Sequence, residues 1–255
     1  MKQTVLITGA SSGIGYEMAR IFASEWYNLV LVAGDRKALK ILEAELPRTK
    51  ITIIVKDLAQ ALSPKEIYEE LNTQEIRVDI LVNNAGFGDY GYFHEIDIEK
   101  EKQMIDLNIK ALTELTYLFG RDMVKRWRGK ILNVASTAAF QPGPLMSVYF
   151  ATKHYVLAFS EGIAEEWEDF WVQVMALCPG PTETHFVKSA NAWKNQMFKK
   201  KLPTAREVAQ FGYDSLIGGK RVAIHGFINR VTAQSVRFMP RNLITKMVKI
   251  MQKGK

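Results

Sequence analysis

The chain has 255 residues, of which 47% are hydrophobic and 24% charged, a composition typical of a globular domain with a well-buried core. Its single cysteine, Cys178, excludes an intramolecular disulfide framework. The sequence has no long apolar run and no signal-peptide core, so we expect a cytoplasmic protein with no transmembrane helix. The net charge of +7 is unevenly distributed, because nine of the 34 Lys and Arg residues follow the last acidic residue, Asp214. Positive charge confined to this end of the chain argues against nucleic-acid binding. It indicates a local contact with a membrane, an anionic ligand or a partner subunit.

Short apolar runs alternate along the chain with patterns typical of helices. This alternation predicts an α/β protein with a doubly wound parallel sheet, right-handed crossovers and helices on both faces. No internal repeat or linker interrupts the pattern, so a single domain is expected. The predicted strands are residues 4–8, 29–33, 51–55, 78–82, 130–135, 172–177 and 222–228, and predicted helices include 37–46, 98–126 and 148–170.

Two further helix starts carry the S/T-x-x-E pattern of a capping box. Ser63 and Glu66 form one, with Pro64 at the first helical position, and Thr204 and Glu207 form the other. Both patterns predict a helix that begins directly after the hydroxyl residue.

A glycine-rich turn follows the first predicted strand. Gly9, Gly13 and Gly15 stand between that strand and a helix, where a backbone without side chains can approach a pyrophosphate at the helix N-terminus. Residues 83–86 (NNAG) end the fourth strand with amides and small residues that suit a nucleotide. Asp57 follows the third strand, where its carboxylate either accepts from an adenine amine or forms an Asx turn. These turns predict a dinucleotide site.

Tyr149 and Lys153 share one face of a predicted helix, and Ser136 precedes the tyrosine by 13 residues. An ammonium group beside a phenol favours the phenolate, which lowers a pKa that is ordinarily about 10. A tyrosine tuned in this way can transfer a proton near neutral pH. The spacing therefore indicates acid/base chemistry.

Together these motifs resemble the short-chain dehydrogenase/reductase family, and its bacterial ketone and 3-oxoacyl reductases in particular. The resemblance spans residues 4–230 and implies a Rossmann-type sheet of seven strands in the order 3-2-1-4-5-6-7. Its motifs are TGASSGIG at 8–15, NNAG at 83–86, Asn108, Ser136, Tyr149, Lys153 and PGPTET at 179–184. It implies nucleotide binding by Gly9, Ser11, Ser12, Gly13, Ile14, Gly15, Asp57, Leu58, Asn84, Ala85 and Gly86, and nicotinamide binding by Pro179, Gly180, Thr182 and Thr184.

The resemblance also implies a mechanism. Tyr149 would be the general acid in carbonyl reduction and the base in oxidation, while Lys153 lowers its pKa and binds the nicotinamide ribose. Ser136 would hydrogen-bond the substrate carbonyl, and Asn108 would hold a water that links Lys153 to solvent. Because these residues are all present, a catalytically silent nucleotide-binding regulator or a membrane-associated scaffold is the less favoured alternative.

The end of the second predicted strand bears on the choice between NAD(H) and NADP(H). An acidic side chain there binds the ribose 2′-hydroxyl, whereas a basic one accepts a 2′-phosphate. The family positions for these groups hold Ala33 and Gly34, followed by Asp35 and Arg36. We favour NADP(H), with Arg36 and Ser11 near the phosphate, although Asp35 could turn into the same place.

Residues 185–203 correspond to the family's substrate lid. The aromatic and lysine residues in this segment favour a lipophilic ketone or aldehyde, or an acyl thioester on a phosphate-bearing carrier. The alternative is that the aromatics pack onto the domain and the lysines are solvated. The residues in question are Phe186, Val187, Trp193, Lys194, Met197, Phe198, Lys199, Lys200 and Lys201.

The last 25 residues, 231–255, form a basic amphipathic extension in place of the family's usual D-G-G ending. Pro240 starts a predicted helix that either lies on an anionic membrane or docks on its own domain or a partner subunit. We expect at least a dimer, paired through helices near 110–126 and 149–168. The four histidines lie far apart, so no metal site is expected. The predicted apolar face of the terminal helix is Leu243, Ile244, Met247, Val248 and Met251, opposite Lys246, Lys249 and Lys253.

Overall fold

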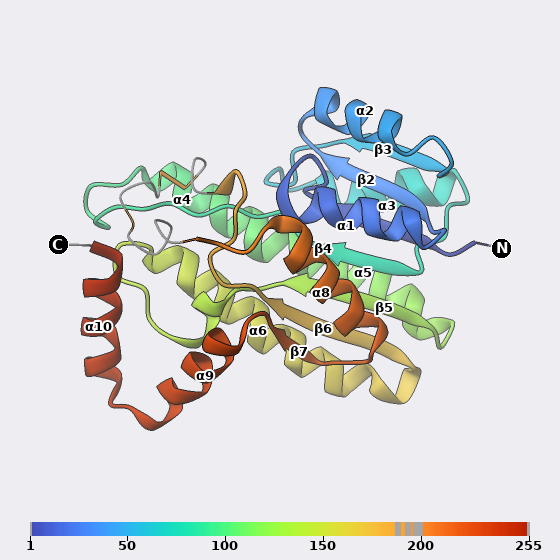
Figure 1. Cartoon of the computed structure of the whole chain (residues 1–255). Helices are drawn as coiled ribbons and strands as arrows, with labels where there is room; N and C mark the ends of the chain where they lie inside the picture. The colour runs from blue at the N-terminus through green and yellow to red at the C-terminus, as the bar shows by residue number, and fades with distance from the viewer. Residues whose placement is uncertain (1, 187–189, 192–194, 196–200, 254–255) are drawn as a thin grey trace.

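A seven-stranded sheet forms the centre of the molecule (Figure 1). The computed structural model describes residues 2–186, 190–191, 195 and 201–253. All paired strands are parallel, in the order β3-β2-β1-β4-β5-β6-β7, which confirms the predicted fold class and strand order. The strands are β1 (Thr4–Thr8), β2 (Asn28–Ala33), β3 (Ile51–Val55), β4 (Ile80–Asn83), β5 (Gly129–Val134), β6 (Val172–Cys178) and β7 (Val222–Ile224).

Helices cover both faces of this sheet, as the uninterrupted apolar strands require. In β1, Val5 and Ile7 face one core and Leu6 faces the other, because successive side chains of a strand point to opposite faces. One core packs under α1, α2 and α8, and the other under α3, α5 and α6. The helices are α1 (Gly13–Ser24), α2 (Arg36–Glu45), α3 (Ser63–Thr73), α4 (Ile98–Ile105), α5 (Leu112–Lys125), α6 (Ser147–Trp167), α8 (Ala205–Ile217), α9 (Phe227–Ser235) and α10 (Arg241–Lys253).

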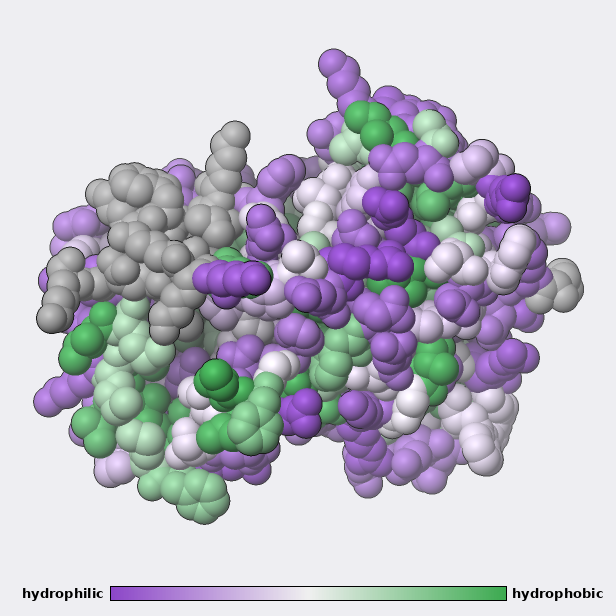
Figure 2. Space-filling view, in the orientation of Figure 1, coloured by the Kyte–Doolittle hydropathy of each residue, from purple (hydrophilic) through white to green (hydrophobic). Residues whose placement is uncertain are grey.

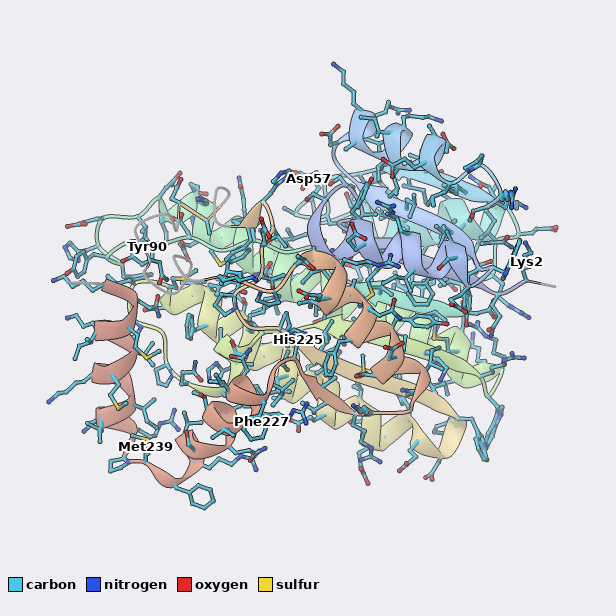
Figure 3. All side chains as sticks on the ribbon, viewed as in Figure 1. Lys2, Asp57, Tyr90, His225, Phe227 and Met239 are labelled. Carbon is cyan, nitrogen blue, oxygen red and sulfur yellow. The ribbon has the colours of Figure 1, made fainter. Side chains whose placement is uncertain are left out.

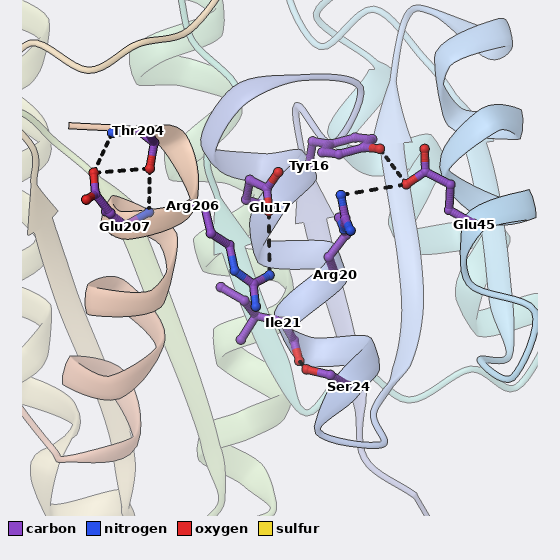
Figure 4. A network of polar contacts seen from close by, with 9 residues as sticks. All are labelled: Tyr16, Glu17, Arg20, Ile21, Ser24, Glu45, Thr204, Arg206 and Glu207. Atoms are coloured by element: carbon purple, nitrogen blue, oxygen red, sulfur yellow. Dashed lines mark hydrogen bonds and ion pairs between the residues drawn. The ribbon is translucent and has the colours of Figure 1, made fainter. Parts of the chain in front are cut away.

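Polar contacts join the three helices on the first face (Figure 4). The Tyr16 hydroxyl of α1 donates to the Glu45 carboxylate of α2 at 2.5 Å, and Arg206 of α8 pairs with Glu17 of α1 at 3.5 Å. These contacts lie at the surface, where each ion pair contributes little to stability. They fix the relative positions of the helices around the glycine-rich turn.

Only one of the two predicted capping boxes forms. Thr204 Oγ1 accepts from the Glu207 N–H at 3.2 Å, and the Glu207 carboxylate accepts from the Thr204 N–H at 2.7 Å, so α8 begins as predicted. The prediction for Ser63 was wrong. Ser63 already lies inside α3, and its hydroxyl donates to the Asp57 carbonyl at 2.8 Å instead. The preceding residue is already helical, which leaves Ser63 out of the extended conformation a cap needs.

The chain leaves the sheet earlier than predicted. The strand expected to reach residue 228 ends at Ile224, because Gly226 adopts a φ of 88° and turns the chain into α9. A short turn at Val236–Phe238 then connects α9 to α10. Figure 1 shows α10 standing at the end of the sheet toward which the strands point.

The terminal helix docks by a narrower stripe than predicted. Ile244 and Val248 are buried with Ala138, Met146 and Phe150 in a small apolar cluster. The other three residues of the predicted apolar face are about half exposed, so only part of that face docks on the domain. Docking uses one residue per turn, which leaves the flanking side chains in solvent. The half-exposed residues are Leu243, Met247 and Met251.

Candidate active site

A cavity of about 470 Å³ opens at the carboxyl ends of the strands. This is where open parallel sheets bind their ligands. All the predicted cofactor and catalytic residues line it except Gly15, Arg36 and Asn108. The fold therefore brings the distant segments that carry these residues to one place, while the three exceptions lie outside the cavity lining.

The glycine-rich turn is built for close backbone approach. Gly9 and Gly13 have φ values of 65° and 57°, which disfavour a side chain. A Cβ on Gly9 would lie 2.9 Å from Ala85 Cα, and one on Gly15 would lie 2.4 Å from Asn84 Nδ2. Gly15 thus allows the turn to pack against the end of β4, outside the cavity.

Asn84 holds the same turn from the other side. Its Nδ2 donates to the carbonyl oxygens of Thr8 and Gly9 at 3.0 and 3.2 Å. The Thr8 hydroxyl in turn accepts from the backbone N–H groups of Asn84 and Ala85, each at 3.0 Å. The amide of Asn84 is therefore committed to the protein, and its contribution to the cavity is to fix the shape of the turn.

The end of β2 leaves open space. A Cβ on Gly34 would meet no atom within 4 Å. Asp35 does not turn toward this space, because its carboxylate caps α2 by accepting from the Ala38 N–H at 3.0 Å. Arg36 begins α2 and is exposed, outside the cavity lining.

Asp57 forms an Asx turn, one of the two roles expected for it. Its Oδ1 accepts from the Ala59 N–H at 3.0 Å, although the residue still lines the cavity. Lys56 lines the cavity beside it and pairs with Glu66 of α3. No sequence motif pointed to Lys56, and its place directly after β3 was the available signal.

Lys153 projects from α6 against the end of β5. Its Nζ donates to the Val134 carbonyl at 2.7 Å and lies 5.8 Å from the centre of the Tyr149 ring. The residue is only 6% exposed, and burial lowers the pKa of its amine to about 8. This amine is thus poised to exchange a proton near neutral pH.

Tyr149 does not have the lowered pKa that was predicted. Burial raises the pKa of its phenol to about 12, and a hydrogen bond with Ser136 only partly offsets this effect. The Lys153 ammonium is directed at the Val134 carbonyl, so the desolvation of the phenol decides the direction. Tyr149 is consequently a neutral proton donor at physiological pH.

Ser136 lies where β5 leaves the sheet. Its Oγ accepts from the Ala138 N–H at 3.1 Å and contacts the Pro179 carbonyl at 3.4 Å. These contacts hold the hydroxyl beside the Tyr149 phenol and connect the ends of β5 and β6. The two hydroxyl groups form a pair that can face one carbonyl oxygen.

Asn108 has a supporting position. It lies in a π-helical turn, Asp106–Ala111, that joins α4 to α5, a feature often found at functional sites. Its Nδ2 donates to the Phe87 carbonyl at 3.0 Å and to Thr152 Oγ1 at 3.1 Å, while its Oδ1 accepts from the Phe87 N–H at 3.2 Å. Asn108 therefore ties the loop after β4 to α6.

A family model described as short chain dehydrogenase matches residues 3–195. The chain belongs to the short-chain dehydrogenase family. This is the family that the motifs indicated, and it makes the protein an oxidoreductase.

Individual members resemble the chain over most of its length. The 2-dehydro-3-deoxy-D-gluconate 5-dehydrogenase of Bacillus subtilis (strain 168) is 30% identical over 223 residues, 86% of this chain and 86% of that protein. The very-long-chain 3-oxoacyl-CoA reductase of Homo sapiens is 31% identical over 189 residues, 72% of this chain and 60% of the human protein. The solved structure of a short-chain dehydrogenase from Sphingobium yanoikuyae in complex with NADPH has a TM-score of 0.83 at 28% identity, covering 99% of this chain and 98% of that one.

The cavity of this short-chain dehydrogenase fits a nicotinamide dinucleotide. The glycine-rich turn presents bare backbone, and Ser12 at the start of α1 makes no side-chain capping bond. No acidic residue lies in the first turn of α1, so nothing there opposes a phosphate. Within the described residues, no group of three or more His, Cys, Asp or Glu side chains could hold a metal ion.

The other end of the cavity has an apolar wall, of which only Phe186 was predicted from the sequence. Met146, Phe150 and Phe186 line it, and the rings of Phe186 and Tyr149 lie 5.2 Å apart. Asn195 and Gln252 line the same end. Phe186 was predicted, but most of the predicted lid residues lie outside the described residues: Val187, Trp193, Lys194, Met197, Phe198, Lys199 and Lys200.

Proposed function

We propose that this protein is an NADPH-dependent reductase that converts a ketone or aldehyde to an alcohol, with Tyr149 as the proton donor. The observation that carries the proposal is the neutral Tyr149 phenol, hydrogen-bonded to Ser136 and next to the buried amine of Lys153. When bound, the reduced nicotinamide supplies the hydride.

In this proposal each protein group has a separate task. Ser136 and Tyr149 donate hydrogen bonds to the carbonyl oxygen, and the Tyr149 phenol transfers its proton as negative charge develops there. Lys153, with a pKa of about 8, holds the proton that restores the phenol after each turnover. Asn108 keeps α6 and the loop after β4 in register and is proposed to hold a water on the path from Lys153 to solvent.

The preference for NADP(H) is supported by the end of β2. The open space at Gly34 can take a 2′-phosphate, and the Asp35 carboxylate that would repel it is committed to capping α2. Ser11 lines the cavity nearby, and Arg36 follows at the start of α2 as the basic group proposed for the phosphate. The Sphingobium yanoikuyae neighbour, solved in complex with NADPH, supports the same choice.

A lipophilic carbonyl compound is the proposed substrate class. The wall formed by Met146, Phe150 and Phe186 beside Tyr149 offers apolar surface. The human relative, named as a very-long-chain 3-oxoacyl-CoA reductase, acts on a substrate with a long acyl chain, which agrees with this class.

The proposal is tested by measuring NADPH consumption with a panel of aliphatic ketones and small polar ketones. Preference for the small polar ketones would contradict the substrate class, and equal turnover by Tyr149→Phe would contradict the mechanism.

The surface supports two association proposals for a protein expected in the cytoplasm. Tyr117 of α5 and Tyr155 of α6 are exposed on neighbouring helices, which supports a dimer through this face. Light scattering on the purified protein tests the dimer, and a monomer would contradict it.

The C-terminal arm, residues 227–253, exposes apolar residues among basic ones, which supports peripheral contact with an anionic membrane. No described helix has the length and apolar character needed to span a bilayer.

A further inference from the structure

The C-terminal end of α10 forms part of the cavity. Gln252 is completely buried and lines the cavity together with the apolar wall beside Tyr149. Its backbone carbonyl accepts a 3.1 Å hydrogen bond from the Tyr90 hydroxyl, so the helix end is fixed in place. Figure 3 shows Tyr90 near this end of α10. A glutamine continues the buried stripe of Ile244 and Val248 at the position where another apolar residue would be expected.

The side-chain amide of Gln252 is only half used. Its Oε1 accepts from Asn195 Nδ2 at 3.4 Å, which orients the amide. Its Nε2 has no hydrogen-bond partner in the described part of the protein. Buried amide donors are nearly always paired, because an unpaired one loses its hydration without compensation. Because Gln252 also lines the cavity, this buried, unpaired N–H is a donor that a bound ligand could satisfy.

An apolar surface separates this donor from the reactive phenol. Around Gly88, a Cβ would lie 2.8 Å from Phe186 Cζ, 3.1 Å from Tyr149 Cδ2 and 3.3 Å from Met146 Cε, so these three side chains meet there. Met146 also reaches the polar end, where its Sδ lies 3.8 Å from Asn195 Nδ2. The cavity therefore runs from a proton donor, along an apolar wall, to a second hydrogen-bond donor.

We propose that Gln252 is a substrate-recognition residue whose Nε2 donates to a second, uncharged acceptor oxygen of the substrate. The substrate class is then a lipophilic ketone or aldehyde that carries an ester, amide or further carbonyl group beyond an apolar spacer. This inference rests on the proposed reductase function and specifies its substrate. A site that pairs a buried polar group with a substrate rejects analogues that leave the group unpaired.

The test compares two kinds of methyl ketone with NADPH. One series carries a terminal methyl ester on chains of increasing length, and each member is paired with the plain alkyl methyl ketone of the same length. The wild-type protein is expected to have a kcat/KM about tenfold higher for the best ester than for its plain partner. Gln252→Met should remove that preference by raising KM for the ester, so that kcat/KM falls more for the ester than for its plain partner.

Gln252→Glu is the sharper variant. It keeps the oxygen that accepts from Asn195 and replaces only the Nε2 donor with an oxygen, so the ester preference should again be lost. Met251→Ala, at the neighbouring exposed position of α10, is the matched control and should retain the preference. If either Gln252 variant lowers both series equally, or weakens NADPH binding, Gln252 acts on the fold or the cofactor and the inference is overturned.

Binding measurements separate this inference from the proposed function. Calorimetric titration of the ester and its plain partner into the protein with NADP⁺ needs no turnover. Absence of any carbonyl reduction by the wild-type protein would contradict the proposed function. Equal affinity of wild type and Gln252→Met for the ester would contradict the role of Gln252, whether or not the protein turns the ester over.

Discussion

Lys153 Nζ donates a 2.7 Å hydrogen bond to the backbone carbonyl of Val134, which holds the amine of α6 against the end of β5. This contact satisfies one of the three donors of an ammonium group, while the side chain is buried. Burial consequently lowers the pKa of Lys153 to about 8 and raises that of Tyr149 to about 12. At neutral pH the Tyr149 phenol is therefore neutral, while Lys153 still carries its proton but releases it more readily than an ordinary lysine.

The first prediction concerns the titration of Tyr149. Its pKa is raised, so in the ligand-free protein its phenol should remain protonated until the pH exceeds that of an ordinary tyrosine. The difference in tyrosinate absorbance between wild type and Tyr149→Phe measures this group alone. We expect no difference below about pH 10, and a difference that appears as the pH approaches 12. A phenolate signal near neutral pH would show that Lys153 dominates after all.

Removing the buried amine should stabilise the protein at neutral pH. The folded-state pKa of Lys153 lies below its unfolded value of 10.5, so the folded protein releases this proton at a lower pH than the unfolded chain does. Below about pH 8 the folded state carries the full cost of a buried ammonium, and this cost is relieved as the pH rises from about 8 to 10.5. Lys153→Met should therefore raise the free energy of unfolding by about 1–3 kcal/mol at pH 7, with a smaller gain above pH 10. Urea unfolding at both pH values measures it.

The same variant is expected to lose most carbonyl reduction, which separates stability from activity. Lys246→Met, on the exposed face of α10, is the control and should change stability little at either pH. A loss of stability in Lys153→Met at pH 7 would mean that the hydrogen bond to Val134 outweighs the cost of burial.

Cofactor choice should respond to the end of β2. Ala33→Asp places a carboxylate at the strand end, where it would repel a 2′-phosphate and accept from a 2′-hydroxyl. We expect kcat/KM for NADPH to fall at least about tenfold while that for NADH rises. Steady-state rates with each cofactor measure the change. Asp35→Asn is the control, since asparagine also caps helices and Asp35 faces Ala38. A strong shift toward NADPH in that control would show that Asp35 does reach the ribose.

The parts of this protein that could be predicted are those fixed by local sequence. The apolar runs determined the strands, and Gly9 and Gly13 marked a turn that only residues without side chains accommodate. Tyr149 and Lys153 are one helical turn apart, so their proximity followed from spacing alone. Their pKa values did not, because burial depends on what the rest of the chain packs around them.

Long-range docking explains what the sequence could not show. Met146 and Phe150 line the cavity and pack against Ile244 and Val248 of a distant helix, a contact that no local pattern indicates. Gln252 carried no motif, and its position in the cavity depends on the angle at which α10 returns to the sheet. Ser63 had the pattern of a cap but lost that role when the preceding turn became helical.

The exposed apolar residues of the C-terminal arm give the last prediction. Phe227, Ile228 and Phe238 are 77%, 79% and 88% exposed, and Figure 2 shows the hydrophobic surface that gathers over α9 and α10. The charged residues of the arm are all basic, so an anionic bilayer is the partner that matches both its exposed apolar side chains and its positive charge. Replacing the three residues with Ser should reduce binding to phosphatidylserine-containing vesicles about tenfold or more, measured by flotation.

Point substitutions are the right test of this arm, because deleting residues 240–255 would also remove the cavity wall that contains Gln252. Trp171→Ser is the matched control, since Trp171 is 79% exposed but lies at the amino-terminal edge of the sheet, directly before β6. It should float like the wild type, and both variants should keep their NADPH affinity, because none of the four residues lines the cavity. If the triple variant floats as well as wild type, or if vesicles without anionic lipid bind equally, the membrane proposal is wrong. The exposed surface would then need a protein partner, and a change in oligomeric state of the triple variant would identify that partner as a second copy of the chain.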